Sequence, residues 1–194
     1  VRPDVLALTS YHVPPAAGMI KLDAMENPYS WPGDLYDKWV EQLKAVDVNR
    51  YPDPHAAELG QKIRRYMAIP DSYDLMLGNG SDELIQIIAM AVAEKGRAIM
   101  APVPSFVMYS MIATFTGLHF KGVPLNAHFD IDLPAFLSAM DEEQPAIVFL
   151  AQPNNPTGNN FGEAAIRAII EHCAGLVVLD EAYLPFTDSN LLPL

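Results

Sequence analysis

The stretch Ala146–Gly158, AIVFLAQPNNPTG, joins an apolar run to a turn rich in proline and asparagine. Apolar residues on consecutive positions predict a strand that is covered on both faces, as in a parallel sheet packed between helices. The other candidate strands are Leu75–Leu77, Ala98–Ala101 and Leu176–Leu179. Apolar residues at helical spacing fill much of the sequence between them, at about 82–95, 105–116 and 162–173. We therefore predict an α/β fold with a mostly parallel sheet that helices cover on both faces.

The rest of the sequence predicts a few more elements and one extended segment. Residues 1–34 contain too many prolines for regular structure, so we expect them to form an extended N-terminal arm. Residues 35–194 are expected to form one globular domain. The further elements expected in this domain are a helix at Leu35–Val46, a helix at Ala56–Met67, a strand within Gly117–Pro124 and a helix at Asp132–Met140.

The composition narrows the class of ligand. The 194 residues are 51% hydrophobic and include 24 acidic against 12 basic side chains, a formal net charge of -12. This charge opposes binding to nucleic acid or to anionic lipid, so we expect a small-molecule ligand. The single cysteine, Cys173, cannot form an internal disulfide, and no metal site is predicted.

The two ends of the chain carry further expectations. No apolar run near the start has the features of a signal peptide or the length of a membrane span, which predicts a cytoplasmic protein. The chain starts at Val1 without a methionine and ends just after a candidate strand. We therefore expect it to be a fragment.

In an open parallel sheet the ligand lies beyond the carboxyl ends of the strands, so the loops at those ends indicate the function. The first such loop is Gly78–Glu83, GNGSDE, which leads into a predicted helix. Glycines let the backbone approach a ligand, and the free amides of a first helical turn bind anions such as phosphate. A glycine turn with Ser81 or Asp82 as helix cap explains the segment equally well. A dinucleotide fingerprint is excluded because Glu83 stands where that motif requires a third glycine.

The next two loops present an aromatic ring and two side-chain amides. Phe106 follows the second candidate strand and could stack on a flat cofactor, although its spacing from Tyr109 favours a place in the core. Asn154 and Asn155 lie between two prolines after the third strand, where an amide can donate to a phenolate oxygen. A turn explains the composition of this loop but not the pair of asparagines between the prolines.

The fourth loop begins with a carboxylate, Asp180, at the end of a strand that is expected to be buried. Burying a carboxylate is costly unless it meets a cation or good donors. A protonated pyridine nitrogen would be such a partner, and a protonated pyridine ring is an electron sink for carbanion chemistry. Tyr183, three residues further on, could reach an oxygen of the same ring. The alternative is that Asp180 caps a helix after the strand.

These four segments, in this order, resemble the fold-type I pyridoxal-phosphate-dependent aminotransferases, and the resemblance covers essentially the whole chain. Asn-Asn-Pro-Thr-Gly at 154–158 with Asp-Glu-Ala-Tyr at 180–183 is a specific pair. Glu26-Asn27-Pro28 and Arg50-Tyr51-Pro52-Asp53 look like the histidinol-phosphate aminotransferase branch. The resemblance implies a truncated large domain of that fold and pyridoxal 5'-phosphate as the cofactor.

The same resemblance implies a role for each candidate residue. Asp180 and Tyr183 are the implied catalytic residues, and Asn27 and Asn155 are the implied substrate contacts. Family members often have tyrosine at the position of Phe106, so this chain keeps the ring and loses its hydroxyl. The implied cofactor contacts are Ser81 and Asp82 at the phosphate, Phe106 on the ring face, Asp180 at the ring nitrogen, Asn155 and Tyr183 at the 3′-oxygen and Tyr51 at the phosphate of the neighbouring subunit, which implies a homodimer.

The family's Schiff-base lysine has no counterpart in this sequence. In the family it follows a serine on a strand beyond Asp-Glu-Ala-Tyr, whereas the six lysines of this chain all precede the Asn-Pro motif. This polypeptide alone is therefore expected not to transaminate. The lysines are Lys21, Lys38, Lys44, Lys62, Lys95 and Lys121.

For the complete enzyme, the resemblance implies transfer of an amino group between glutamate/2-oxoglutarate and histidinol phosphate/imidazole acetol phosphate in histidine biosynthesis. One alternative is a lyase like threonine-phosphate decarboxylase, which shares the fold, the cofactor contacts and a phosphorylated substrate. A second is an aromatic or broad-specificity aminotransferase. A third is a degenerate binding module without catalysis, which the retained, costly Asp180 argues against.

Overall fold

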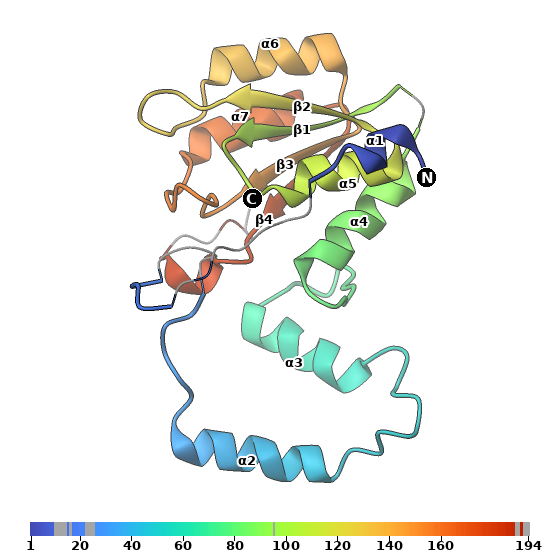
Figure 1. Ribbon diagram of the computed structural model, residues 1–194, viewed down its shortest axis with the longest axis vertical. Helices are drawn as coiled ribbons and strands as arrows, with labels where there is room; N and C mark the ends of the chain where they lie inside the picture. The colour runs from blue at the N-terminus through green and yellow to red at the C-terminus, as the bar shows by residue number, and fades with distance from the viewer. Residues whose placement is uncertain (10–14, 16, 22–25, 95, 189–190, 192–194) are drawn as a thin grey trace. The chain divides into compact units, whose positions relative to one another are not determined.

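The computed structural model describes residues 1–9, 15, 17–21, 26–94, 96–188 and 191 (Figure 1). The chain forms two compact units. One unit comprises Val1–Tyr11 and Gly78–Leu194, and the other comprises His12–Leu77. The predicted division into an arm at 1–34 and a domain at 35–194 stays a prediction.

The first unit is built on a four-stranded parallel sheet with strand order β2-β1-β3-β4. Ile99 of β1 pairs with Ile147 of β3, and Ala151 at the end of β3 pairs with Asp180 at the end of β4. The strand predicted within Gly117–Pro124 is confirmed as β2, at the edge of the sheet. The strands are β1 Ala98–Val103, β2 His119–Pro124, β3 Ile147–Ala151 and β4 Leu176–Asp180.

Helices cover both faces of this sheet, as the consecutive apolar residues of the strands predict (Figure 1). Ile147 and Phe149 point to one face and belong to a core cluster with residues of α4 and α5. Val148 and Leu150 point to the other face and belong to a cluster with residues of α6 and α7. This alternation places the whole of β3 out of contact with water. The helices are α4 Ser81–Val92, α5 Met108–Thr116, α6 Leu133–Glu143 and α7 Glu163–His172.

The start of α6 shows how local sequence sets an element boundary. The Asp132 side chain accepts a hydrogen bond from the Ala135 amide at 3.2 Å, and a proline lies in the first turn. Both features favour a helix start, because the first turn has amides without partners and proline lacks one. The helix predicted at Asp132–Met140 is thereby confirmed.

One predicted strand is wrong. Residues 75–77 form neither a strand nor a helix, and Met76 and Leu77 are exposed. Three apolar residues make a strand only where a neighbouring strand pairs with them, and no such partner is present among the described strands. Three, not four, of the candidate loops therefore follow strands, and the segment Gly78–Gly80 enters α4 from an irregular stretch.

The N-terminal residues differ from the predicted extended arm at one point. A short helix, α1 Pro3–Leu6, begins with a proline at its first turn, a position that needs no amide hydrogen. The Arg2 guanidinium donates to the carbonyl oxygens of Thr114 and Phe115 in the last turn of α5. This contact fixes the start of the chain to the first unit.

The second unit contains two helices, α2 Gly33–Lys44 and α3 Ala57–Met67, which confirm the helices predicted at 35–46 and 56–67. The Asp53 side chain accepts hydrogen bonds from the amides of His55 and Ala57 and so closes the start of α3. None of the helices in the described ranges combines the length and the apolar character that a bilayer span requires.

Candidate active site

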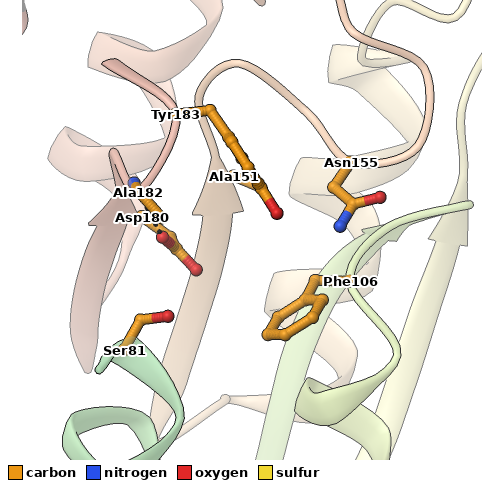
Figure 2. Close-up of a pocket in the computed structure, with 7 residues that line it drawn as sticks. All are labelled: Ser81, Phe106, Ala151, Asn155, Asp180, Ala182 and Tyr183. Atoms are coloured by element: carbon orange, nitrogen blue, oxygen red, sulfur yellow. Dashed lines mark hydrogen bonds between the residues drawn. The ribbon is translucent and has the colours of Figure 1, made fainter. Parts of the chain in front are cut away.

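A small, partly open cavity lies at the carboxyl ends of β3 and β4 (Figure 2). Its wall includes the paired strand ends Ala151 and Asp180. The described residues that line it are Ser81, Phe106, Ala151, Asn155, Asp180, Ala182 and Tyr183.

Five of the predicted site residues therefore surround one cavity. In Figure 2 the Asn155 amide and the Tyr183 hydroxyl point toward one another across the cavity, and the Phe106 ring lies below the Asn155 amide. The Asp180 carboxylate and the Ser81 hydroxyl lie on the opposite side of the cavity from Phe106. Phe106 also packs against the core cluster of α4 and α5, so it is both a core residue and a cavity residue.

Two hydrogen bonds hold the Asp180 carboxylate in place. Oδ2 accepts from the Tyr109 hydroxyl at 2.8 Å, and Oδ1 accepts from the Ala182 amide at 3.1 Å. No lysine, arginine or histidine in the described part of the chain forms an ion pair with it. The alternative that Asp180 caps a helix is wrong, because the next element is the short 3₁₀ helix Leu184–Phe186, whose N-cap is Tyr183. Asp180 is thus an oriented carboxylate at the cavity wall.

Tyr109 is a site residue that the sequence argument missed. Its side chain is fully buried, its ring stacks on Phe149 with centroids 4.7 Å apart, and it meets Phe106 edge-on at 5.6 Å. Burial raises the pKa of the Tyr109 phenol, and the Asp180 carboxylate raises it further. The phenol therefore stays protonated and donates to Asp180. The helical spacing from Phe106 indicated a core position, but a buried tyrosine hydroxyl also needs an acceptor, and that requirement was the available signal.

Ser81 is the first residue of α4, and its side chain lines the cavity. The alternative that Ser81 or Asp82 caps this helix is wrong, because α4 has no side-chain cap. Instead, the Glu83 carboxylate accepts from the Asn79 amide at 2.6 Å and closes the preceding turn. Gly80 enters the helix with a φ of +83°, a conformation that favours glycine. The amides of the first turn of α4 are therefore available to an anion.

Asp82 is exposed and is not among the residues that line the cavity. Its predicted contact with the cofactor phosphate stays a prediction. Asn154, the neighbour of Asn155, is buried and also does not line the cavity. No group of three histidine, cysteine, aspartate or glutamate side chains able to hold a metal ion occurs among the described residues.

Residues 17–192 match the family of class I and II aminotransferases. The chain belongs to this aminotransferase family. Five cavity residues occur along the chain in the same order as the cofactor contacts that the resemblance implies. They are Ser81, Phe106, Asn155, Asp180 and Tyr183.

Named relatives of this aminotransferase chain agree on one activity. It is 51% identical over 193 residues to histidinol-phosphate aminotransferase 2 of Nitrosococcus oceani. The matched region covers 100% of the chain and 54% of the relative. It is 52% identical over 181 residues to a histidinol-phosphate aminotransferase sequence of Thiocapsa roseopersicina. The matched region covers 93% of the chain and 96% of that sequence. Apart from the Thiocapsa sequence, the chain spans about half the length of the curated relatives it matches.

A solved structure gives the same fold. The histidinol-phosphate aminotransferase of Sinorhizobium meliloti, in complex with pyridoxal-5'-phosphate, matches 76% of this chain and 40% of its own, with a TM-score of 0.67 and 26% identity. This likeness supports the predicted fold class, the α/β large domain of the fold-type I aminotransferases.

Two predicted site residues of this aminotransferase lie in the other compact unit. The Tyr51 side chain is fully exposed, and the Asn27 side chain accepts from the Tyr29 amide at 3.0 Å. Their roles at the neighbouring subunit's phosphate and at the substrate stay predictions. No lysine is among the described residues that line the cavity.

Proposed function

We propose that the protein containing this chain is a pyridoxal-phosphate-dependent histidinol-phosphate aminotransferase and that the cavity beyond β3 and β4 is its cofactor site. The observation that carries the proposal is the convergence of Ser81, Phe106, Asn155, Asp180 and Tyr183 on one cavity. Relatives named for this activity are about half identical to the chain, which supports the same substrate class.

The side chains around the cavity fit the chemistry of this cofactor. Asp180 offers a carboxylate without a cationic partner among the described residues, which suits a protonated ring nitrogen. The start of α4, with Ser81, suits a phosphate. Phe106 offers an aromatic surface for a flat ring, and both Asn155 and Tyr183 carry groups that can donate to a ring oxygen.

When bound, pyridoxal phosphate supplies a carbonyl group that accepts the amino group and an electron-withdrawing ring that stabilises negative charge beside it. Asp180 would accept a hydrogen bond from the protonated ring nitrogen and so keep the proton there. Tyr109 holds Oδ2 of Asp180, and the Ala182 amide holds Oδ1, so the carboxylate meets the ring without reorganising. Asn155 and Tyr183 would donate hydrogen bonds to an oxygen of the ring. Phe106 excludes water from the ring face.

We further propose the substrates and the assembly that the resemblance implies. The amino group moves between glutamate/2-oxoglutarate and histidinol phosphate/imidazole acetol phosphate, in histidine biosynthesis in the cytoplasm. Asn27 and Asn155 contact the substrate. In a homodimer, Tyr51 reaches the cofactor phosphate of the neighbouring subunit, a role that suits its exposed side chain. Asp82 assists at the phosphate.

The proposal is tested with the purified complete protein, pyridoxal phosphate and three substrates. Consumption of histidinol phosphate that depends on 2-oxoglutarate supports it. Release of carbon dioxide from phosphothreonine would instead indicate the lyase, and a higher rate with phenylalanine than with histidinol phosphate would indicate a broad-specificity aminotransferase. Binding of the cofactor without any turnover would indicate a binding module.

A further inference from the structure

One buried side chain, Asn154, joins two loops that carry cavity residues. Its side chain is fully buried, and it does not line the cavity. Its Oδ1 accepts from the Ser105 hydroxyl at 2.9 Å, and its Nδ2 donates to the Pro104 carbonyl oxygen at 3.1 Å. Pro104 and Ser105 follow β1, whereas Asn154 follows β3. The amide therefore ties the loop after β1 to the loop after β3.

Asn154 also organises its own loop. Its Nδ2 donates to the Thr157 hydroxyl at 2.7 Å, and its backbone amide donates to the Asn159 carbonyl oxygen at 2.9 Å. Its carbonyl oxygen accepts from the Gly158 amide at 2.7 Å. Every polar group of this residue is thus bonded within the protein. An asparagine with all these groups satisfied and no contact with water holds its surroundings rigidly.

Each end of this connection is next to a cavity residue in the chain. Ser105 immediately precedes Phe106, and Asn154 immediately precedes Asn155. Figure 2 places Phe106 and Asn155 on the same side of the cavity, with the Asn155 amide above the ring. The bonds of Asn154 therefore connect the backbone that carries this ring to the backbone that carries this amide.

We propose that Asn154 is a positioning residue that fixes Phe106 relative to Asn155. Phe106 can then contact the face of a flat ring ligand while Asn155 donates to one of its oxygens. The inference rests on the proposed function, which supplies the ring. Asparagine suits the position because the Ser105 hydroxyl needs an acceptor and the Pro104 carbonyl needs a donor. The two adjacent asparagines then have separate tasks: the first joins the loops, and the second faces the ligand.

The test uses the complete protein with pyridoxal phosphate and three measurements: the dissociation constant from a titration, the circular dichroism that the protein induces in the bound cofactor, and the melting temperature without cofactor. Ser105→Ala removes one neutral donor to Asn154 and should raise the dissociation constant about 2- to 12-fold. Asn154→Asp places an acceptor opposite the Pro104 carbonyl oxygen and should raise it further, about 5- to 150-fold. Both variants should weaken the induced dichroism.

Two controls accompany these variants. Ser105→Thr keeps the hydroxyl and should restore the affinity of the wild type. Asn160→Ala removes an asparagine of the same loop whose amide donates to the Thr187 hydroxyl at 2.7 Å, away from the loop after β1. It should change neither the affinity nor the dichroism.

Four results would overturn the inference. A lower melting temperature with unchanged affinity and dichroism would mean that Asn154 only stabilises its loop. An equal loss in Asn160→Ala would mean that any change in this loop has the same effect. If the wild type binds pyridoxal phosphate and all variants bind it equally, the positioning role fails and the proposed function stands. If the wild type does not bind it, both fail.

Discussion

Replacing Tyr109 by phenylalanine removes one oxygen atom and leaves the packed ring in place. The ring stacks on Phe149 at a centroid distance of 4.7 Å and an interplanar angle of 6°, and phenylalanine keeps this contact. What is lost is the hydrogen bond of 2.8 Å from the hydroxyl to Oδ2 of Asp180. The carboxylate then keeps only the amide of Ala182 as a described partner.

The size of the effect follows from this one bond. Hydrogen bonds to charged groups contribute about 1.5–3 kcal/mol. Asp180 borders the cavity and is only partly buried, so water can replace part of the lost bond. The lower value, about 1.5 kcal/mol, is therefore expected, which corresponds to about a tenfold weaker affinity for pyridoxal phosphate.

The assay is a titration of the complete protein with pyridoxal phosphate, repeated for Tyr109→Phe, Asp180→Asn and the double variant. Since the phenol acts through the carboxylate, its effect should largely disappear once Asp180 is asparagine, so the two changes should not be additive. Tyr73→Phe is the matched control, because Tyr73 is exposed in the other compact unit. It should bind like the wild type.

An affinity of Tyr109→Phe within twofold of the wild type would show that the phenol does not orient Asp180 for the cofactor. So would a tenfold loss that persists unchanged beside Asp180→Asn, because the phenol would then act by another route. A loss in the Tyr73→Phe control of the same size would show that the assay reports general damage.

The remaining predictions concern the charge at Asp180, the pH dependence of stability, the backbone at Gly80 and the thiol of Cys173. In the proposed site, Asp180→Asn removes the charge that would retain a proton on the ring nitrogen. It should lower the transamination rate of the complete protein at least about a hundredfold, measured with histidinol phosphate and 2-oxoglutarate; an undiminished rate would contradict the proposed role. Because the pKa of Tyr109 is raised in the folded state, the stability it contributes is complete below about pH 10 and declines above it, by up to about 1.4 kcal/mol per pH unit, as unfolded tyrosine ionises. Urea unfolding at pH 9 and above pH 10 should therefore show a smaller alkaline loss in Tyr109→Phe than in the wild type, and equal losses would contradict this. Gly80→Ala places a side chain on a residue with a φ of +83° and should lower the free energy of unfolding by about 1–3 kcal/mol. Gly33 has open space around it and no positive φ, so Gly33→Ala should change the free energy of unfolding little. Equal effects of the two variants would contradict backbone strain at Gly80. Burial raises the pKa of the Cys173 thiol, so iodoacetamide at pH 8 should modify it more slowly than free cysteine, and an equal rate would count against that burial.

Much of the fold follows from local sequence patterns. The strands β1, β3 and β4 were predicted from consecutive apolar residues, and the alternation of Ile147 and Val148 between the two core clusters explains why both faces had to be apolar. The strand predicted at Leu75–Leu77 failed for a non-local reason. A strand exists only through its neighbour, and three residues of sequence do not reveal whether a neighbour is present.

The predicted cavity residues could be identified because each is an unusual polar or aromatic residue at or just beyond the end of a strand, or at the start of a helix. The residues that support them were not predictable in the same way. Tyr109 meets Asp180 across 71 positions of sequence, and Asn154 meets Ser105 across 49. Apolar spacing identifies Tyr109 as buried, and composition identifies Asn154 as part of a turn, but the acceptor or donor that each one needs is set by the sheet. The pair of asparagines was a visible signal whose meaning depended on that contact.

In the proposed site, five side chains of this chain surround one ring, with its nitrogen at Asp180. A crystal structure of the complete protein with pyridoxal phosphate tests this directly. We expect the ring to stack on Phe106, with one of its oxygens within hydrogen-bond distance of Asn155 and Tyr183 and its nitrogen about 3 Å from the Asp180 carboxylate. A ring bound elsewhere, or one whose nitrogen faces away from Asp180, would contradict it.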